Sequence, residues 1–286
     1  MKLSVFTAST PEWTPEQAAC TLAAQGWDGI EWRIVDQSDA PEPGFWAGNR
    51  ATWPFTGIED RVDEIARVTS EAGLAISGIG GYQVLGDRDG VLSMLRITAR
   101  LGAARVRVVM PSSGGERRAA EAFAEARSEL AWVADRAGEL GVQALVELHQ
   151  GTITPSASAA IRLIDGLDPA HVGVIHDLGN LVVEGQEHHR MAFEMLGPYL
   201  AHVHVKNAGW VDTGRVRSDG SAIWESRWMP LRSGQAAVGE YLDDLRTHGY
   251  DGWITLEDFS VETPLEPRTA RSLDYLRSLL AGDTPA

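Results

Sequence analysis

The sequence predicts an α/β fold, namely a single closed (β/α)8 barrel. Short β-rich runs recur through all 286 residues, and each is followed by a longer stretch with helical spacing of apolar residues. Eight such pairs average about 36 residues, which is close to the repeat length of this barrel. Because no linker rich in Pro, Gly and Ser divides the chain, we expect one domain over residues 1–286.

The predicted strands are short runs of apolar and β-branched residues. They cover residues 3–6, 29–32, 75–78, 104–109, 142–147, 172–176, 201–205 and 253–256. Thr14 and Pro15 are typical of a helix start, and Gly26 ends that helix. Further helices are predicted over 116–140, 156–167, 236–248 and 269–280, and Gly141 and Gly249 stand where C-caps belong.

Two segments are too long for simple connections, residues 35–57 and 207–234. Both follow predicted strands, so we expect them over the C-terminal face of the barrel, where active sites of this fold lie. An open, doubly wound sheet is the alternative architecture. No Gly-x-Gly-x-x-Gly follows the first strand, so the dinucleotide-binding form of that architecture gains no support.

Charge and cysteine usage narrow the classes of function. The chain has 25 Lys and Arg against 40 Asp and Glu, a formal charge of −15, which argues against binding to nucleic acid or anionic membranes. The single cysteine, Cys20, cannot form an intramolecular disulfide, and the first residues lack the apolar run of a signal peptide. No run approaches the roughly 18 apolar residues that span a bilayer. We therefore expect a cytoplasmic protein.

Four consecutive predicted strands in the second half of the chain end in a potential ligand. These residues are Glu147, Asp177, His204 and Glu257. One acid at a strand end fits a solvent-facing or helix-capping position equally well. In a closed barrel, however, four successive strand ends converge on one side of its opening, which favours a shared metal site.

Three carboxylates and one imidazole form a mostly oxygen ligand set. Such a set suits Mn²⁺, Mg²⁺ or Co²⁺ in octahedral coordination better than a structural zinc ion. We expect a divalent metal cofactor, with manganese as first choice. Water or substrate oxygens would complete the coordination.

Four segments carry a resemblance to a known family: residues 146–149, 176–180, 201–207 and 249–257. The chain resembles, nearly end to end, the sugar phosphate isomerase/epimerase superfamily with a xylose-isomerase-like TIM barrel. That superfamily includes ketose 3-epimerases, hydroxypyruvate isomerases and inosose dehydratases. The resemblance implies that Glu147, Asp177, His204 and Glu257 are the metal ligands, and that Glu147 and Glu257 are also the catalytic acid/base pair.

A divalent ion that holds a carbonyl oxygen and a neighbouring hydroxyl stabilises the enediolate formed when the adjacent proton leaves. Return of a proton to the other face gives an epimer, and transfer to the neighbouring carbon gives aldose–ketose isomerisation. Loss of a β-hydroxyl gives dehydration. The ligand set alone does not choose among these three reactions.

Further residues are candidates for substrate binding. His149 shares the strand parity of Glu147, and Lys206 shares that of His204, so both are expected to point into the opening; an orienting role for His149 fits equally well. Asn180 stands where epimerases of the family have a substrate-binding histidine. Arg33 ends the second strand and is expected to face substrate.

Two other histidines are expected away from the metal. His202 is predicted deeper in the barrel, and His176 has the opposite parity to Asp177 and is predicted to pack against a helix. Five tryptophans in the two long segments suit stacking on a sugar or an aromatic aglycone, although anchoring of the loops fits equally well: Trp46, Trp53, Trp210, Trp224 and Trp228.

The leading hypothesis is a metal-dependent isomerase or epimerase that acts on a keto-sugar or related polyol derivative. The alternative is a lyase, either an inosose-type dehydratase or a 3-keto C-glycoside deglycosidase-like subunit that works with a partner. A homo-oligomer is expected only by family resemblance. A DNA-cleaving relative would need more clustered histidines and a basic surface, and a sugar-binding protein without turnover would not need all four ligands.

Overall fold

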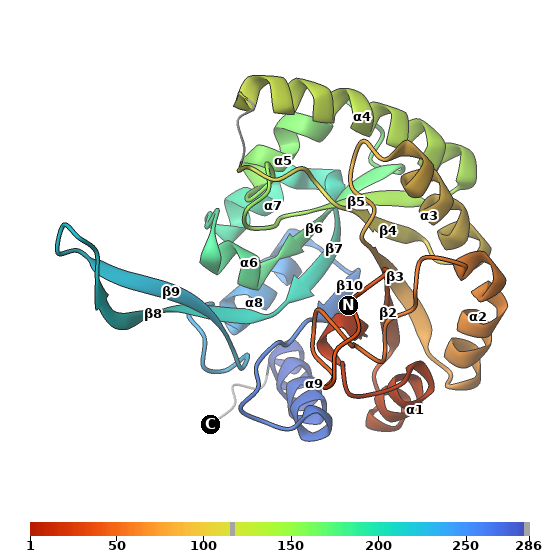
Figure 1. The fold of residues 1–286 in the computed structure, drawn as a ribbon, viewed down its shortest axis with the longest axis horizontal. Coiled ribbons are helices and arrows are strands. Elements are labelled where there is room, and N and C mark those ends of the chain that lie inside the picture. Colours follow the sequence, from red (N-terminus) through yellow and green to blue (C-terminus); the bar gives the residue numbers. More distant parts are fainter. Residues whose placement is uncertain (115–117, 283–286) are drawn as a thin grey trace.

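A computed structural model describes residues 1–114 and 118–282 and shows a closed barrel of parallel strands surrounded by helices (Figure 1). The strand order around the barrel is β1-β10-β7-β6-β5-β4-β3-β2. The predicted fold class is confirmed. The barrel strands are β1 (Lys2–Phe6), β2 (Gly29–Ile34), β3 (Ala75–Gly81), β4 (Arg105–Val108), β5 (Gln143–Glu147), β6 (Val172–Asp177), β7 (Leu200–Val205) and β10 (Trp253–Leu256).

All eight predicted barrel strands form, and the largest differences are at the ends of β2 and β3. Both run two or three residues past their predicted ends because Arg33 pairs with Gly80, and Ile34 with Gly81. A prediction based on strand propensity misses this extension of β3, because glycines at 78, 80 and 81 have a low propensity for strands.

The helices cover the outside of the barrel. The first predicted helix is confirmed in detail, because Thr14 and Gln17 form a reciprocal capping box and Gly26 adopts the left-handed conformation. Residue 116, the predicted start of the fourth helix, lies outside the described residues. The helices are α1 (Pro15–Gln25), α2 (Val62–Glu71), α3 (Arg88–Arg100), α4 (Ala119–Leu140), α5 (Ala157–Ile164), α6 (Leu178–Val183), α7 (His189–Leu196), α8 (Val238–His248) and α9 (Leu265–Ala281), with short 3₁₀ turns at Thr7–Ser9, Ile58–Asp60 and Gly197–Tyr199.

The apolar core lies mainly between the strands and the helices. Fully buried side chains such as Leu22, Ile65 and Leu245 come from helices and meet barrel residues such as Ile30 and Ile254. Burial of this apolar surface is the main favourable contribution to folding. The barrel interior, by contrast, contains many buried polar and charged side chains, which positions the site described below.

The long segment 207–234 is largely an antiparallel hairpin rather than an irregular loop. Strands β8 (Asn207–Val216) and β9 (Ala222–Met229) form a ribbon that projects from the barrel (Figure 1). The dipeptide Asp219-Gly220 between the strands is a hairpin signal, and Gly220 has a positive φ of 85°. Segment 35–57, between β2 and α2, is mostly irregular.

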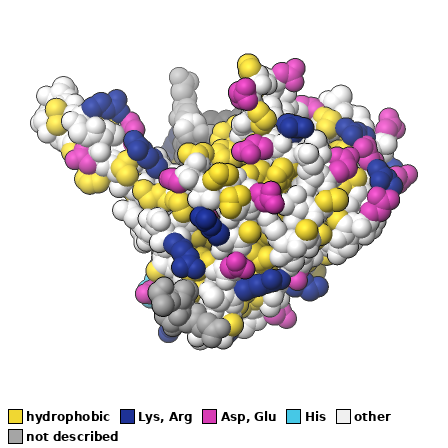
Figure 2. All heavy atoms as spheres, turned by 90° about the horizontal axis from the view of Figure 1, so that it is seen from below, with side chains coloured by type: hydrophobic (Ala, Val, Ile, Leu, Met, Phe, Trp, Pro, Cys, Tyr) yellow, Lys and Arg dark blue, Asp and Glu magenta, His cyan; other side chains and the backbone are white. Residues whose placement is uncertain are grey.

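Figure 2 shows one face of the molecule, on which acidic and basic side chains are interspersed and the ribbon extends to one side. Among the described residues, no helix is long and apolar enough to cross a membrane. The exposed large apolar side chains include Trp210 and Trp224 on the ribbon.

Candidate metal centre

Four side chains converge at the C-terminal end of the barrel. Glu147 ends β5, Asp177 ends β6, His204 lies near the end of β7, and Glu257 directly follows β10. These strands are consecutive around the barrel, and one ligand atom from each residue lies within 4.8 Å of the others. The predicted convergence of the four residues is therefore present in the structure.

The imidazole of His204 faces three carboxylates through its Nδ1 atom. This nitrogen lies 3.6 Å from Glu147 Oε1, 3.6 Å from Asp177 Oδ2 and 3.9 Å from Glu257 Oε2. Within the described residues it has no hydrogen-bond partner, although it is buried. Ligand atoms about 2.0–2.6 Å from one ion lie at such separations. An orphaned nitrogen among carboxylate oxygens therefore fits a divalent cation.

The ring of His204 is held by its surroundings. Phe6 of β1 stacks on it, with ring centroids 5.7 Å apart and an interplanar angle of 26°. Phe6 fits there because Gly80 of β3 has no side chain; a Cβ at Gly80 would lie 2.2 Å from the Phe6 ring. On its other side, His204 Nε2 lies 3.1 Å from Glu31 Oε2.

Glu147 is held by two donors that the sequence did not predict. Arg107 of β4 forms a buried ion pair with it at 2.7 Å, and Asn180 Nδ2 donates to it at 3.3 Å. Burial favours a raised pKa for Glu147, but the Arg107 guanidinium and His204 outweigh it and hold this pKa well below its usual range. Glu147 is thus ionised near neutral pH.

Glu257 is in a different electrostatic environment. Burial raises the pKa of its carboxyl to about 7, despite the attraction of Lys206 and His204 and with a further contribution from the charges of Asp177 and Glu147. Lys206 Nζ contacts Glu257 Oε2 and lies 2.8 Å from Asp177 Oδ2. In the metal-free protein, the two glutamates on the flanks of the site therefore differ in protonation near pH 7.

A cavity of about 470 Å³ opens at this centre. Glu147, Lys206 and Glu257 reach it, and His149 lines it as its strand parity predicts. Its other polar and aromatic lining includes Trp46, Tyr82, Arg107, Trp228 and Phe259. The size fits a small organic molecule, and its mixture of aromatic surface and a few charged groups is typical of ligand sites.

The structure places the remaining predicted residues outside the cavity lining. Asn180 is buried and also donates to Leu148 O at 3.0 Å, so its amide supports Glu147. Arg33 is buried behind the aromatic wall, 5.0 Å from the Tyr82 ring, and donates to Gln37 and Thr52.

The two other histidines lie where their parity predicts. His176 is fully buried, with its Nδ1 2.8 Å from the Tyr241 hydroxyl of α8, and it does not face the metal ligands. His202 lies deeper in the barrel and contacts Glu31 at 2.8 Å. Burial favours a raised pKa for Glu31, but the two imidazoles of His204 and His202 outweigh it and hold this pKa well below its usual range.

The five tryptophans of the long segments separate into three groups. Trp46 and Trp228 line the cavity, Trp53 is buried against Trp32, and Trp210 and Trp224 lie on the projecting ribbon. Sequence reasoning missed Tyr82, Arg107 and Phe259 as cavity residues. For Arg107, the alternation Arg-Val-Arg-Val in β4 was an available signal, because it places arginines on one face of a barrel strand.

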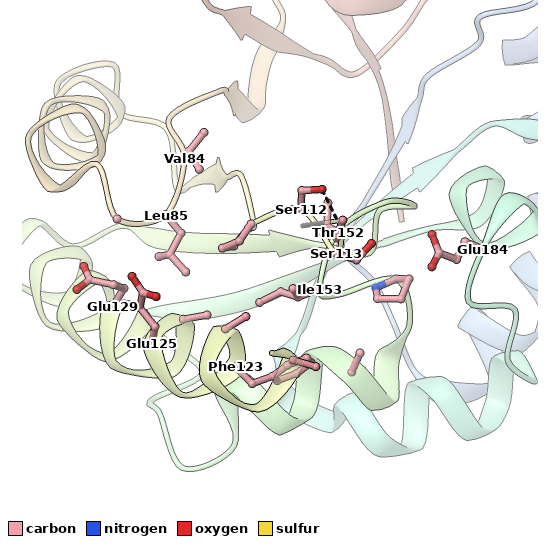
Figure 3. A pocket seen from close by; sticks show the side chains of 18 residues that line it. Val84, Leu85, Ser112, Ser113, Phe123, Glu125, Glu129, Thr152, Ile153 and Glu184 are labelled. Atoms are coloured by element: carbon pink, nitrogen blue, oxygen red, sulfur yellow. Dashed lines mark hydrogen bonds between the residues drawn. The ribbon is translucent and has the colours of Figure 1, made fainter. Parts of the chain in front are cut away.

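A second and larger cavity, of about 760 Å³, lies beside the first (Figure 3). Thr152 lines both cavities, and Phe123 and Ile153 give the larger one an apolar wall, with Glu129 and Glu184 near its edge. Among the described residues that line it there is no His, Lys or Arg. The convergent polar groups are therefore in the smaller cavity.

Comparison with known proteins identifies the family. The model of the family described as xylose isomerase-like TIM barrel matches residues 21–279. The chain belongs to this family.

A curated relative is the inosose dehydratase of Bacillus velezensis, which is 29% identical over 138 residues. The aligned region covers 46% of this chain and 46% of the relative. The chain thus spans about half the length of the curated relatives it matches.

Three solved structures of this barrel type share the fold. The 3-keto-D-glucoside 4-epimerase of E. coli has a TM-score of 0.71 and 17% identity, over 97% of this chain and 99% of that one. A protein with a bound zinc atom has a TM-score of 0.73 and 14% identity over 100% of both chains. A Mycobacterium smegmatis family protein in complex with magnesium has a TM-score of 0.69 and 18% identity, over 99% and 98%. At these identities the likeness shows the fold alone.

Proposed function

We propose that this chain is a divalent-metal-dependent isomerase or epimerase of a keto-sugar or related polyol derivative. The observation that carries the proposal is the convergence of Glu147, Asp177, His204 and Glu257 beside a cavity of about 470 Å³. The four side chains would hold the metal. When bound, a divalent ion polarises a substrate carbonyl and stabilises the negative charge that develops after proton removal.

The two glutamates would then exchange protons with the substrate. Glu147 is kept ionised by Arg107 and is the candidate base. Glu257, in contact with Lys206, is the candidate partner that exchanges a proton at the other face of the substrate. Glu147 on β5 and Glu257 after β10 flank the other two ligands, so they would approach a substrate from different sides. That arrangement supports epimerisation or isomerisation.

The cavity lining suggests how a substrate would be held. His149 and Lys206 offer hydrogen-bond donors for hydroxyl or carbonyl oxygens, and Trp46 and Trp228 offer apolar surface for the C–H face of a sugar. Asn180 and Arg33 would act indirectly, through Glu147 and the aromatic wall respectively.

The metal is proposed as Mn²⁺, with Mg²⁺ and Co²⁺ as alternatives. Three carboxylates and one imidazole favour oxygen-preferring ions. One structure with the same fold contains magnesium and another contains zinc, which supports a divalent ion but does not favour one metal. Replacing one ion by another in activity measurements would decide the choice.

A lyase reaction is the second candidate, because the sequence relatives are inosose dehydratases. Dehydration begins with the same proton removal and ends with loss of a hydroxyl group as water, and the proton that the base has taken up would complete this water. A role as a deglycosidase-like subunit with a partner belongs to the same class of reaction.

Proton exchange in D₂O tests the proposal even while the product is unidentified. Keto-sugars, inososes and 3-keto-glycosides would be incubated with the protein and Mn²⁺, Mg²⁺ or Zn²⁺ and followed by NMR. Metal-dependent deuterium incorporation next to a carbonyl is the expected result. Epimers or isomers as products support the first candidate, and loss of water or of an aglycone supports the second. A metal-loaded protein that exchanges no proton in any of these compounds would contradict both.

A further inference from the structure

A buried network lies directly beneath the candidate metal centre. Glu31 Oε2 of β2 contacts two imidazoles of β7, at 2.8 Å from His202 Nε2 and 3.1 Å from His204 Nε2. His202 Nε2 also lies 2.9 Å from Thr255 Oγ1, which is 2.7 Å from Ser4 Oγ. Every member is at most 1% exposed. We call these five residues the Glu31 network.

The network crosses the barrel interior. In the barrel, β1 and β10 stand between β2 and β7, so the Glu31 side chain reaches across the interior to both histidines. The interior of such barrels is usually filled by bulky apolar residues. Buried polar side chains are costly unless they are hydrogen-bonded. Each of the five makes at least one of these contacts, whereas Nδ1 of His202 has no partner among the described residues.

Hydrogen-bond chemistry assigns the two nitrogens of His204. An ionised carboxylate oxygen only accepts hydrogen bonds, so an imidazole nitrogen 3.1 Å from it carries a proton. A neutral imidazole has one N–H, and its other nitrogen keeps a lone pair. In His204 that other nitrogen is Nδ1, which faces the three carboxylates and has no hydrogen-bond partner among the described residues.

We propose that Glu31 is a positioning residue that holds His204 with Nε2 protonated and Nδ1 directed at the metal. Thr255 and Ser4 extend this support through His202. Histidines that bind metals commonly donate their second N–H to a carboxylate, and loss of that partner typically weakens metal binding about 10–100-fold. The inference rests on the metal centre of the proposed function.

The distances argue against a second ion between Glu31 and the two histidines. Two nitrogens within 3.1 Å of a single carboxylate oxygen have the spacing of direct hydrogen bonds. An ion there would also require His204 to lose both protons while bridging two metals. A second metal ion is nevertheless a measurable outcome of the test.

Calorimetric titration with Mn²⁺ tests the inference on the full chain. Glu31→Gln preserves shape and should raise the dissociation constant about 10–100-fold while metal stoichiometry stays at one. Glu262→Gln, an exposed acid in the loop after β10, is the matched control and should bind as the unmodified chain does. Thr255→Val removes a more distant contact and should weaken binding less than Glu31→Gln. Equal affinity of Glu31→Gln and the unmodified chain would overturn the inference.

A second measurement is made on the unmodified chain, and variants serve only to assign signals and to locate a second ion. With ¹⁵N-labelled histidine and ¹¹³Cd²⁺ as the probe, NMR should show coupling of cadmium to Nδ1 of His204 and a proton on Nε2. His202→Gln assigns the signals. Coupling to Nε2, or two ions per chain of which Glu31→Gln removes one, would overturn the inference. Absence of any metal binding by the unmodified chain would instead contradict the proposed function.

Discussion

At the scale of residues, the carboxylates of the site differ in the cationic side chain that lies beside each of them. Arg107 lies beside Glu147, whereas Lys206 lies between Asp177 and Glu257. The sequence placed the four ligands at successive strand ends, because strand parity is readable from a short alternating run. It did not reveal the contact of Arg107 on β4 with β5, or the contacts of Glu31 on β2 with β7. These contacts depend on where long side chains point inside the closed barrel, which a sequence pattern does not show.

Glu147→Gln and Glu257→Gln should each lower turnover by a factor of about 10²–10⁴, because each variant removes one of the two groups that would move protons. Steady-state kinetics on the substrate identified by D₂O exchange would measure this. Glu262→Gln, on the surface, is the control. Turnover within a factor of two of the unmodified chain in either variant would exclude that glutamate as acid or base.

Metal binding should release protons in a pH-dependent number. Below pH 7 an ion must displace the proton of Glu257, whose pKa burial raises to about 7, and that of His204, whose pKa is raised, against the effect of burial, by Glu31 and the ligand carboxylates. We therefore expect more protons to be released per ion at pH 6 than at pH 8.

Calorimetry in buffers of different ionisation enthalpy counts these protons. Glu257→Gln should release one proton fewer than the unmodified chain at pH 6. The affinity for Mn²⁺ should rise as the pH increases from 5 to 7. A pH-independent affinity would show that Glu257 is already ionised in the metal-free protein.

At the scale of elements, small residues on the barrel strands leave space for the large side chains that cross the interior. A Cβ at Gly80 of β3 would lie 2.2 and 2.4 Å from atoms of the Phe6 ring, which stacks on His204. The strand prediction ended β3 early because its glycines lack β propensity. At Gly80 the requirement is steric, and it is visible only once β1 and β3 are placed in the same barrel.

Gly80→Ala should destabilise the fold by about 1–3 kcal/mol through overpacking. It should also weaken Mn²⁺ binding, because Phe6 can no longer hold the His204 ring. Urea unfolding and metal titration measure the two effects. Gly239→Ala is the control: its Cβ would lie 3.4 Å from Leu279 Cδ2, and alanine within α8 should leave stability unchanged or slightly increased. Unchanged metal affinity in Gly80→Ala would refute the support by Phe6.

His176 joins β6 to α8 and should make the metal-free protein sensitive to acid. Burial lowers the pKa of His176 to about 3, compared with an unfolded value near 6.5. Because the unfolded chain binds this proton first, stability falls as the pH drops below 6.5, by about 2 kcal/mol between pH 7 and pH 5. Urea unfolding at both pH values measures the loss. His176→Gln should reduce it by that amount, and an equal loss in both proteins would contradict the assignment.

At the scale of the whole molecule, the regular repeat made the barrel predictable. Eight consecutive pairs of strand and helix without a linker favour a closed barrel, because few other architectures bury the apolar face of every element. The ribbon of β8 and β9 was not predicted, because two exposed strands lack the apolar alternation of a core strand, although Asp219-Gly220 signalled the turn. The C-terminal face was the expected place of the site, but the cavity itself was not predicted, because its walls combine side chains from segments far apart in the sequence, such as Trp46, Tyr82 and Trp228.

The central claim is that one divalent ion binds where the four strand ends meet. Diffraction from crystals soaked in Mn²⁺, recorded at a wavelength with strong anomalous scattering from manganese, tests it most directly. The account predicts one anomalous peak within about 2.0–2.4 Å of His204 Nδ1 and of oxygens from Glu147, Asp177 and Glu257. A fully soaked crystal with no peak among these four residues, or with its strongest peak elsewhere, would contradict it.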